Sequence, residues 1–427
     1  MRAILQKLKK RTWLLLLSLL AFLLPFLTVK AQRPYVIVID PGHGGENLGA
    51  QYDGYTEKEM TMIVARAMKE ELEKYENVAV YLTHDTDTDM SLEERAEFAL
   101  QKQADFLFCL HFNSSVKHNL YGAEVWIPAF DDYYVSGRQF AEIEMEVLTG
   151  SGLYSRGIKT KLSKRGDDYY GILRHCSERQ IPSVLIEHCH LDHDYDKPFY
   201  QKGEEQLREF GRKDAEAAAR YFGLVSAVLG TDYSQETLRE IKRPEGAVKP
   251  DETQPETCDI RVLSIDEKTG EITVNMTASD SDSYIQYYQY SFDGGSTVSE
   301  LKKWPRPVWY QSDPELTFKV TVPFDEEIRL CAYAYNGFDL KTMSNIVPVA
   351  KIPSFREEEI TKEKPNKHYR EISYEGAGET DTQKSILLIV VIVLLSLLIS
   401  CFIYIVSGML LRRKRKKRKR NSRRRGK

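Results

Sequence analysis

Apolar and polar residues alternate along the first half of the chain in a pattern typical of an α/β protein. Short apolar runs rich in β-branched and aromatic residues predict buried strands; they lie at 35–39, 78–82, 106–110, 122–127 and 183–186. Between them, apolar residues recur at helical spacing and predict helices; these cover about 60–75, 92–100 and 204–222. The alternation predicts an open mixed sheet with helices on both faces over residues 34–223.

The pattern changes after residues 224–256, which carry prolines among charged residues and are typical of a linker. Over residues 257–352, strand patterns follow one another without helices, and Asp293-Gly294-Gly295 is a hairpin turn signal. We expect a small all-β sandwich that resembles immunoglobulin or fibronectin type III folds. A run of four tyrosines fits either packing inside this sandwich or stacking on sugars; they are Tyr284, Tyr287, Tyr288 and Tyr290.

Two long apolar runs lie near the ends of the chain. The first follows several Lys and Arg residues and precedes Val29-Lys30-Ala31, which predicts a secretory signal peptide over residues 1–31, with an uncleaved signal anchor as the alternative. The second, Ser385–Leu411, has no charged residue and is long enough to cross the ~30 Å core of a bilayer as a C-terminal transmembrane helix. Residues 353–384 are polar and charged, as expected of a stalk.

Charge is distributed unevenly along the chain. Residues 412–427 hold thirteen Lys and Arg and no acid, and residues 1–31 hold six, which leaves 41 of the 60 basic residues and all 63 acidic residues between the two ends, a net charge of −22. By the positive-inside rule the basic tail stays in the cytoplasm, and binding to anionic lipid is a second interpretation of it. We therefore expect a cell-membrane protein with its folded part outside the cytoplasm, and the acidic folded part argues against nucleic acid as a partner.

Three strands of the α/β region end in residues that bind metals or transfer protons. Strand 35–39 leads through Asp-Pro-Gly to His43, strand 106–110 leads to His111, and strand 183–186 leads to Glu187. Open α/β sheets bind ligands at the carboxyl ends of their strands. We therefore expect the three side chains to converge on one crevice.

Glu57 is a fourth candidate. Thr56 and Glu59 fit a capping box, which places Glu57 in the first turn of a helix. His43, Glu57 and His111 with one water would make the three-ligand open site of a catalytic zinc ion, and Glu187 would be the carboxylate that moves the proton. Each residue also has an ordinary structural interpretation, such as a first-turn acid stabilised by the helix dipole.

Five segments, in this order, resemble the zinc-dependent N-acetylmuramoyl-L-alanine amidases; they are 36–45 (VIVIDPGHGG), 49–50 with 56–58 (GA, TEK), 91–95 (SLEER), 104–114 (ADFLFCLHFNS) and 181–187 (IPSVLIE). The resemblance covers about residues 35–223. It implies zinc bound by His43, Glu57 and His111, and catalysis by Glu187. It also implies the substrate, the amide bond between N-acetylmuramic acid and the L-alanine of the peptidoglycan stem peptide.

The segment after Glu187 departs from the family pattern. Where the family has a small residue followed by Gly-Phe and a Ser-Asn pair, this chain has His188-Cys189-His190-Leu191-Asp192-His193. We interpret these histidines as solvated loop residues rather than as a second metal site, and expect a different shape on this side of the cleft. Two other functions stay open, a catalytically silent wall-binding ectodomain and a zinc peptidase acting on peptidoglycan cross-links.

Overall fold

The computed structural model describes residues 33–354. The predicted signal peptide (1–31), transmembrane helix (Ser385–Leu411) and basic tail (412–427) lie outside the described residues, as does nearly all of the predicted stalk (353–384). Within the described part of the chain, no helix is both long and apolar enough to cross a membrane.

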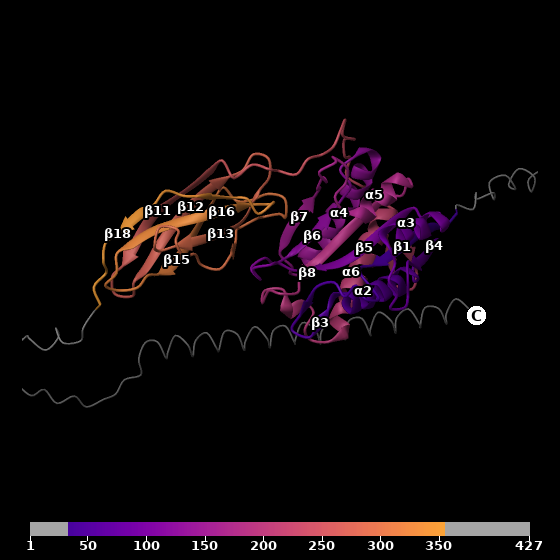
Figure 1. Cartoon of the computed structure of the whole chain (residues 1–427), viewed down its shortest axis with the longest axis horizontal. Coiled ribbons are helices and arrows are strands. Elements are labelled where there is room, and N and C mark those ends of the chain that lie inside the picture. Colours follow the sequence, from indigo (N-terminus) through magenta and orange to yellow (C-terminus); the bar gives the residue numbers. More distant parts are fainter. Residues whose placement is uncertain (1–32, 355–427) are drawn as a thin grey trace, which may run out of the picture. The chain divides into compact units, whose positions relative to one another are not determined.

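The α/β region, residues 34–223, is built on a six-stranded sheet (Figure 1). In spatial order its strands are β4 (Val78–Leu82), β1 (Tyr35–Pro41), β5 (Phe106–Asn113), β8 (Ser183–His190), β6 (Ala123–Trp126) and β7 (Ser155–Lys159). Neighbouring strands are parallel except β6 and β8, which are antiparallel. The predicted open mixed sheet is therefore confirmed.

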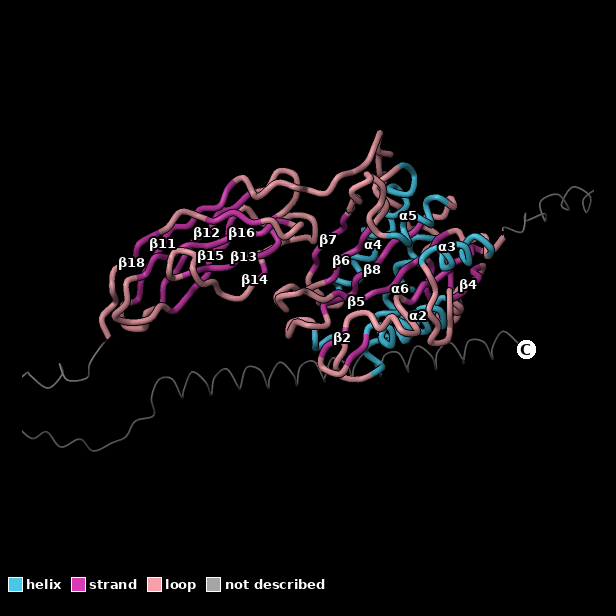
Figure 2. The backbone as a smooth tube through the Cα atoms, viewed as in Figure 1, coloured by secondary structure: helices cyan, strands magenta, loops and turns pink. Residues whose placement is uncertain are grey.

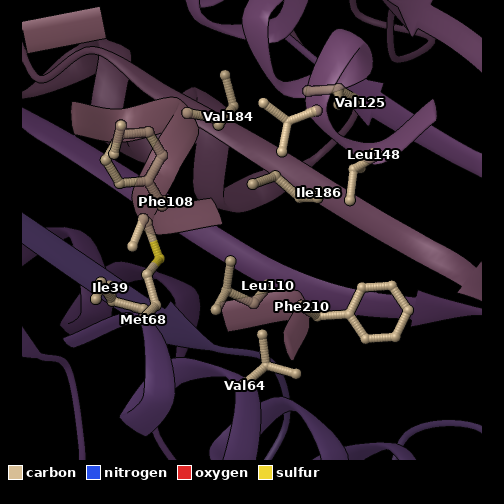
Figure 3. Close-up of a cluster of buried hydrophobic side chains, with 14 of the residues drawn as sticks. Ile39, Val64, Met68, Phe108, Leu110, Val125, Leu148, Val184, Ile186 and Phe210 are labelled. Atoms are coloured by element: carbon tan, nitrogen blue, oxygen red, sulfur yellow. The ribbon is translucent and has the colours of Figure 1, made fainter. Parts of the chain in front are cut away.

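Helices cover both faces of this sheet. One layer is formed by α2 (Glu57–Leu72), α4 (Asp131–Gly150) and α6 (Glu204–Phe222), and the other by α3 (Leu92–Gln101) and α5 (Gly171–Glu178). Because side chains alternate along a strand, Ile37 and Ile39 of β1 lie in the core of the first layer while Val38 lies in the core of the second. Figure 3 shows the first core, where Met68 of α2 and Phe210 of α6 join residues of β1, β5 and β8.

Helix α2 begins where the sequence predicted, but its cap differs. Thr56 is the N-cap residue, yet its side chain makes no capping hydrogen bond, so the predicted capping box is absent. Thr56 also belongs to a two-stranded ribbon of β2 (Gln51–Tyr52) and β3 (Tyr55–Thr56). A capping box is present on α3 instead, between Ser91 and Glu94.

The β region, residues 257–352, contains two antiparallel sheets (Figure 2). The first holds β11 (Thr257–Asp266), β12 (Glu271–Ser279) and β15 (Glu315–Thr321), and the second holds β13 (Ile285–Ser291), β14 (Lys302–Lys303), β16 (Ile328–Asn336), β17 (Lys341–Met343) and β18 (Val347–Val349). Side chains of both sheets share one buried cluster. Tyr288 is buried in this cluster, as the packing interpretation of the tyrosine run predicts, whereas Tyr287 is buried outside it, in a separate cluster with Tyr121 and Leu301.

The segment between the two regions is held against the α/β region. It contains a short antiparallel pair, β9 (Val225–Ser226) with β10 (Thr231–Asp232). The amide of Val248 donates to the carbonyl of Ala129 at 2.8 Å, and the Thr160 hydroxyl donates to the carbonyl of Val248 at 2.7 Å. All described residues fall in one compact unit.

Candidate active site

The three predicted metal ligands come together at the carboxyl end of the sheet. His43 lies in the loop after β1, and Glu57 lies in the first turn of α2. His111 lies inside β5, because this strand continues beyond the predicted range 106–110. Nε2 of His43 lies 3.0 Å from Oε2 of Glu57, and Nδ1 of His111 lies 2.9 Å from Oε1. Ligand atoms of all three lie within 4.8 Å of one another, so the group could hold a metal ion.

Two glycines make room for these ligands. In a tetrahedral site with bonds of ~2.0–2.2 Å, neighbouring ligand atoms are roughly 3.3 Å apart, so small side-chain shifts would admit an ion. A Cβ atom on Gly42 would lie 2.5 Å from the His111 ring, and one on Gly49 would lie 2.6 Å from Oε2 of Glu57. Gly49 also has φ +67°, a conformation that favours glycine. The residues present fit a metal.

The carboxylate of Glu57 is held in place by the backbone. The amides of Ala50 and Phe112 donate to its two oxygens at 2.8 and 3.0 Å. Burial opposes ionisation of this group, but hydrogen bonds to His111 and His43 outweigh burial and hold the pKa of Glu57 well below its usual range. The group is therefore ionised and directed at both imidazoles.

His43 is oriented by Asn47, a residue that was not among the predicted site residues. Its Nδ1 lies 2.9 Å from Oδ1 of Asn47, which leaves Nε2 to face Glu57. His43 has φ 67°, a strained conformation for a non-glycine residue that is typical of functional sites. The Gly-rich sequence around it was the available signal for such a backbone.

A buried ion pair between Arg95 and Asp40 stabilises the loop that carries His43. Arg95 of α3 donates from Nη1 to Oδ1 of Asp40 at 2.8 Å and to the carbonyl of Pro41 at 2.7 Å, and from Nη2 to the carbonyl of His43 at 2.6 Å. Both side chains are almost fully buried. Thr83 also donates to Asp40 at 2.6 Å. In the sequence, Arg95 stands out only as part of a family segment, and no local pattern indicates this contact.

Glu187 lies beside the metal group. In β8 it is in register with His111 of β5 on one side and with Glu124 of β6 on the other, so the three side chains form a row on one face of the sheet. Its Oε2 is buried and has no hydrogen-bond partner among the described residues. Burial, followed by the negative charges of Glu57 and Glu124, raises the pKa of Glu187 well above its ordinary value. His43, Glu57, His111 and Glu187 line one cavity of about 560 Å³.

Two of the three histidines after Glu187 are not solvated loop residues, so that interpretation was wrong for His188 and His190. Strand β8 continues to His190, and both His188 and His190 are buried. His188 contacts the carbonyl of His111 through Nδ1 at 2.9 Å and Asp214 of α6 through Nε2 at 2.9 Å. Across residues 33–354, the group of His43, Glu57 and His111 is the one set of three or more such ligands that could hold a metal. His188 instead fixes the backbone of a ligand-bearing strand.

Fold and site together define the class of the chain, an α/β protein with a candidate metal centre in a cleft at its strand ends. Residues 37–217 match the family model described as N-acetylmuramoyl-L-alanine amidase. The chain is 30% identical to the N-acetylmuramoyl-L-alanine amidase CwlM of Bacillus licheniformis over 195 residues, which are 44% of this chain and 69% of that protein. The chain belongs to the N-acetylmuramoyl-L-alanine amidase family.

The chain covers different shares of other relatives. The amidase LytC of Bacillus subtilis (strain 168) is 29% identical over 190 residues, 44% of this chain but 35% of LytC, so the chain spans about a third of that relative. Among solved structures, the amidase AmiC2 of Nostoc punctiforme is similar with 28% identity and a TM-score of 0.36, over 44% of this chain and 94% of AmiC2. The part of this chain that matches the family model, residues 37–217, lies within the α/β region.

Proposed function

We propose that this protein hydrolyses the amide bond between N-acetylmuramic acid and L-alanine in peptidoglycan, with zinc bound by His43, Glu57 and His111. The observation that carries the proposal is the His–Glu–His group in one cavity with the unpartnered carboxylate oxygen of Glu187. Membership of a family named for this activity supports the choice of bond. Zinc, when bound, would act as a Lewis acid that polarises the scissile carbonyl.

Glu187 takes the proton of the attacking water and passes it to the leaving amine of L-alanine. A general base works best when its pKa lies near the working pH, and the raised pKa of Glu187 moves the group in that direction. Asn47 holds His43 in the tautomer that presents Nε2 to the site. The cavity of about 560 Å³ is of the size that holds a small substrate segment.

Digestion of purified peptidoglycan by the full-length protein, followed by mass analysis, tests this function. We expect stem peptides with a new L-alanine amine, and loss of this product after chelation with recovery on adding zinc. A peptidase acting on cross-links would leave peptide attached to the sugar, and a silent wall-binding ectodomain would release nothing. Either of these outcomes contradicts the proposal.

We also propose that the protein is held in the cell membrane by Ser385–Leu411, with residues 34–352 outside the cell and the basic tail on anionic lipid of the inner leaflet. The uncharged run and the thirteen basic residues after it support this topology. The two antiparallel sheets with a common core support a sandwich of the immunoglobulin or fibronectin type in the β region.

Protease added to intact cells checks the topology. We expect digestion of the α/β and β regions, while an epitope within residues 412–427 is protected until the cells are opened. Lysed cells, in which every part is accessible, are the control. Protection of the α/β region in intact cells would contradict the extracellular assignment.

A further inference from the structure

A second cavity adjoins the active-site cavity. It has a volume of about 510 Å³ and shares Asn113 and Tyr170 with the first cavity as lining residues. Its remaining walls come from three parts of the chain that are far apart in sequence: the α/β region, the segment Pro250–Glu252, and the turn Phe338–Leu340 between β16 and β17. The β region therefore contributes a wall to a space that begins at the candidate active site.

A buried charge network fixes that wall. Arg156 of β7 is almost fully buried and pairs with Glu124 at 2.9 Å and with Asp339 of the β region at 2.7 Å. Glu124 also accepts hydrogen bonds from Lys159 and Asn113, both at 2.8 Å. Through Glu124 and Arg156 the network joins Asn113, on the shared wall, to Asp339 in the β region. Breaking a buried pair would leave an unpaired charge, so these contacts hold the wall firmly in place.

The tyrosine run completes this attachment. The hydroxyl of Tyr284 donates to the carbonyl of Arg156 at 2.7 Å, and that of Tyr287 donates to the carbonyl of Tyr121. Arg306 donates to the carbonyl of Ser155. Tyr287 is fully buried. Tyr284 and Tyr287 therefore hold the β region against the α/β region and are not free to stack on sugars.

Phe338 has no evident packing role. Its ring is half-buried, yet it belongs to none of the hydrophobic clusters formed by the described residues. It lines the second cavity, where Nζ of Lys159 lies 5.7 Å from the ring centre. An aromatic side chain that is half-exposed in a cavity is suited to contact a ligand.

The charges of the cavity favour a peptide as its occupant. Glu252 and Lys161, which are exposed, bring charges of both signs to its lining. The stem peptide carries amide groups, carboxylates and amines, whereas N-acetylated glycan strands are uncharged. A lining with both signs therefore complements the peptide better than the glycan.

We propose that the second cavity binds the stem peptide beyond L-alanine, and that Phe338 and Asp339 of the β region are specificity-determining residues. This inference rests on the proposed amidase function. The sugar and the scissile amide occupy the first cavity, the peptide passes between Asn113 and Tyr170, and its distal residues contact Phe338. A volume of about 510 Å³ is within the range of ligand pockets.

The test compares two substrates with the full chain, N-acetylmuramoyl-L-alanine and N-acetylmuramoyl-pentapeptide. We expect the wild-type protein to prefer the longer substrate. Phe338→Ala should lower the ratio of kcat/KM for the long substrate to that for the short one by about tenfold, a typical effect of losing one apolar contact in a pocket. Phe338→Leu, which keeps an apolar side chain, should give a smaller loss and covers the case in which the alanine variant misfolds.

Phe324→Ala is the matched control. Phe324 is also a half-buried phenylalanine of the β region, but it packs against the core shared by the two sheets, so its loss should leave the ratio unchanged. An unchanged ratio in both Phe338 variants would overturn the inference. A loss of kcat/KM in these variants that depends on the length of the glycan, with the peptide kept constant, would overturn it too. Failure of the wild-type protein to cleave either substrate would instead contradict the proposed function.

Binding of the free stem peptide gives a readout that does not depend on turnover. Calorimetry with wild-type protein should detect binding of the pentapeptide, and Phe338→Ala should weaken it about tenfold. Asp339→Asn keeps the size of the side chain and removes its charge from the pair with Arg156, so it should weaken binding as well. Equal affinity in all three proteins would overturn the inference.

Discussion

Replacement of Glu187 by glutamine is expected to leave about one zinc per chain and to lower turnover by about 10²–10⁴-fold. Glutamine keeps the size and the hydrogen-bonding groups of the side chain but cannot accept the proton. Glu187 lies outside the His–Glu–His group, so zinc affinity should be retained. Glu57→Gln should act differently, because Glu57 supplies the negative ligand between His43 and His111, and zinc and activity should fall together.

Metal content and the rate of amide cleavage, measured on the same preparations, separate these roles. Glu178→Gln is the matched control, since Glu178 is an exposed carboxylate on α5 and the same substitution there should change neither quantity. Loss of zinc from Glu187→Gln would make it a ligand or a structural residue. Near-normal cleavage would remove it from the mechanism.

The strands that carry the site were predictable because they are buried on both faces. Their apolar runs are almost wholly buried in β1, β5 and β8. The edge strand β4 (Val78–Leu82) and helix α6 (Glu204–Phe222) also match their predicted ranges. Strands β5 and β8 extend further at their carboxyl ends than predicted. The prediction stopped where polar residues interrupt each apolar run, which is where the strands enter the cleft. His111 and Glu187 are therefore inside strands rather than after them.

Contacts between residues far apart in the chain could not be predicted from the sequence. His188 can be buried because Asp214, 26 residues later, accepts a hydrogen bond from its Nε2. No local pattern distinguishes such a histidine from a solvated one. Helix α4, strand β7 and helix α5 were not predicted. The short strand β7 is buried although it carries Arg156 and Lys159, because Glu124 and Asp339 pair with these charges. A sequence with two charged residues in five does not indicate a buried strand.

Replacement of Arg95 by methionine should destabilise the fold by about 3–5 kcal/mol, because it leaves Asp40 buried without its partner. Both side chains are nearly inaccessible to water. The same substitution frees the carbonyls of Pro41 and His43, to which Arg95 donates. The variant should therefore also bind zinc more weakly, since the loop that carries His43 loses its support. Chemical unfolding and metal content measure the two effects.

A matched control and a double variant identify the physical cause. Arg179→Met removes an arginine that pairs with the exposed Glu93 and the half-buried Glu97, and neither pair is fully buried, so it should cost less than about 1 kcal/mol. If the unpaired charge of Asp40 is the main cost, Asp40→Asn in the Arg95→Met background should recover part of the lost stability, because the remaining buried group is neutral and still accepts from Thr83. A double variant less stable than Arg95→Met would show that the lost hydrogen bonds to the loop, rather than the buried charge, account for the effect. An Arg95→Met protein as stable as Arg179→Met would contradict both explanations.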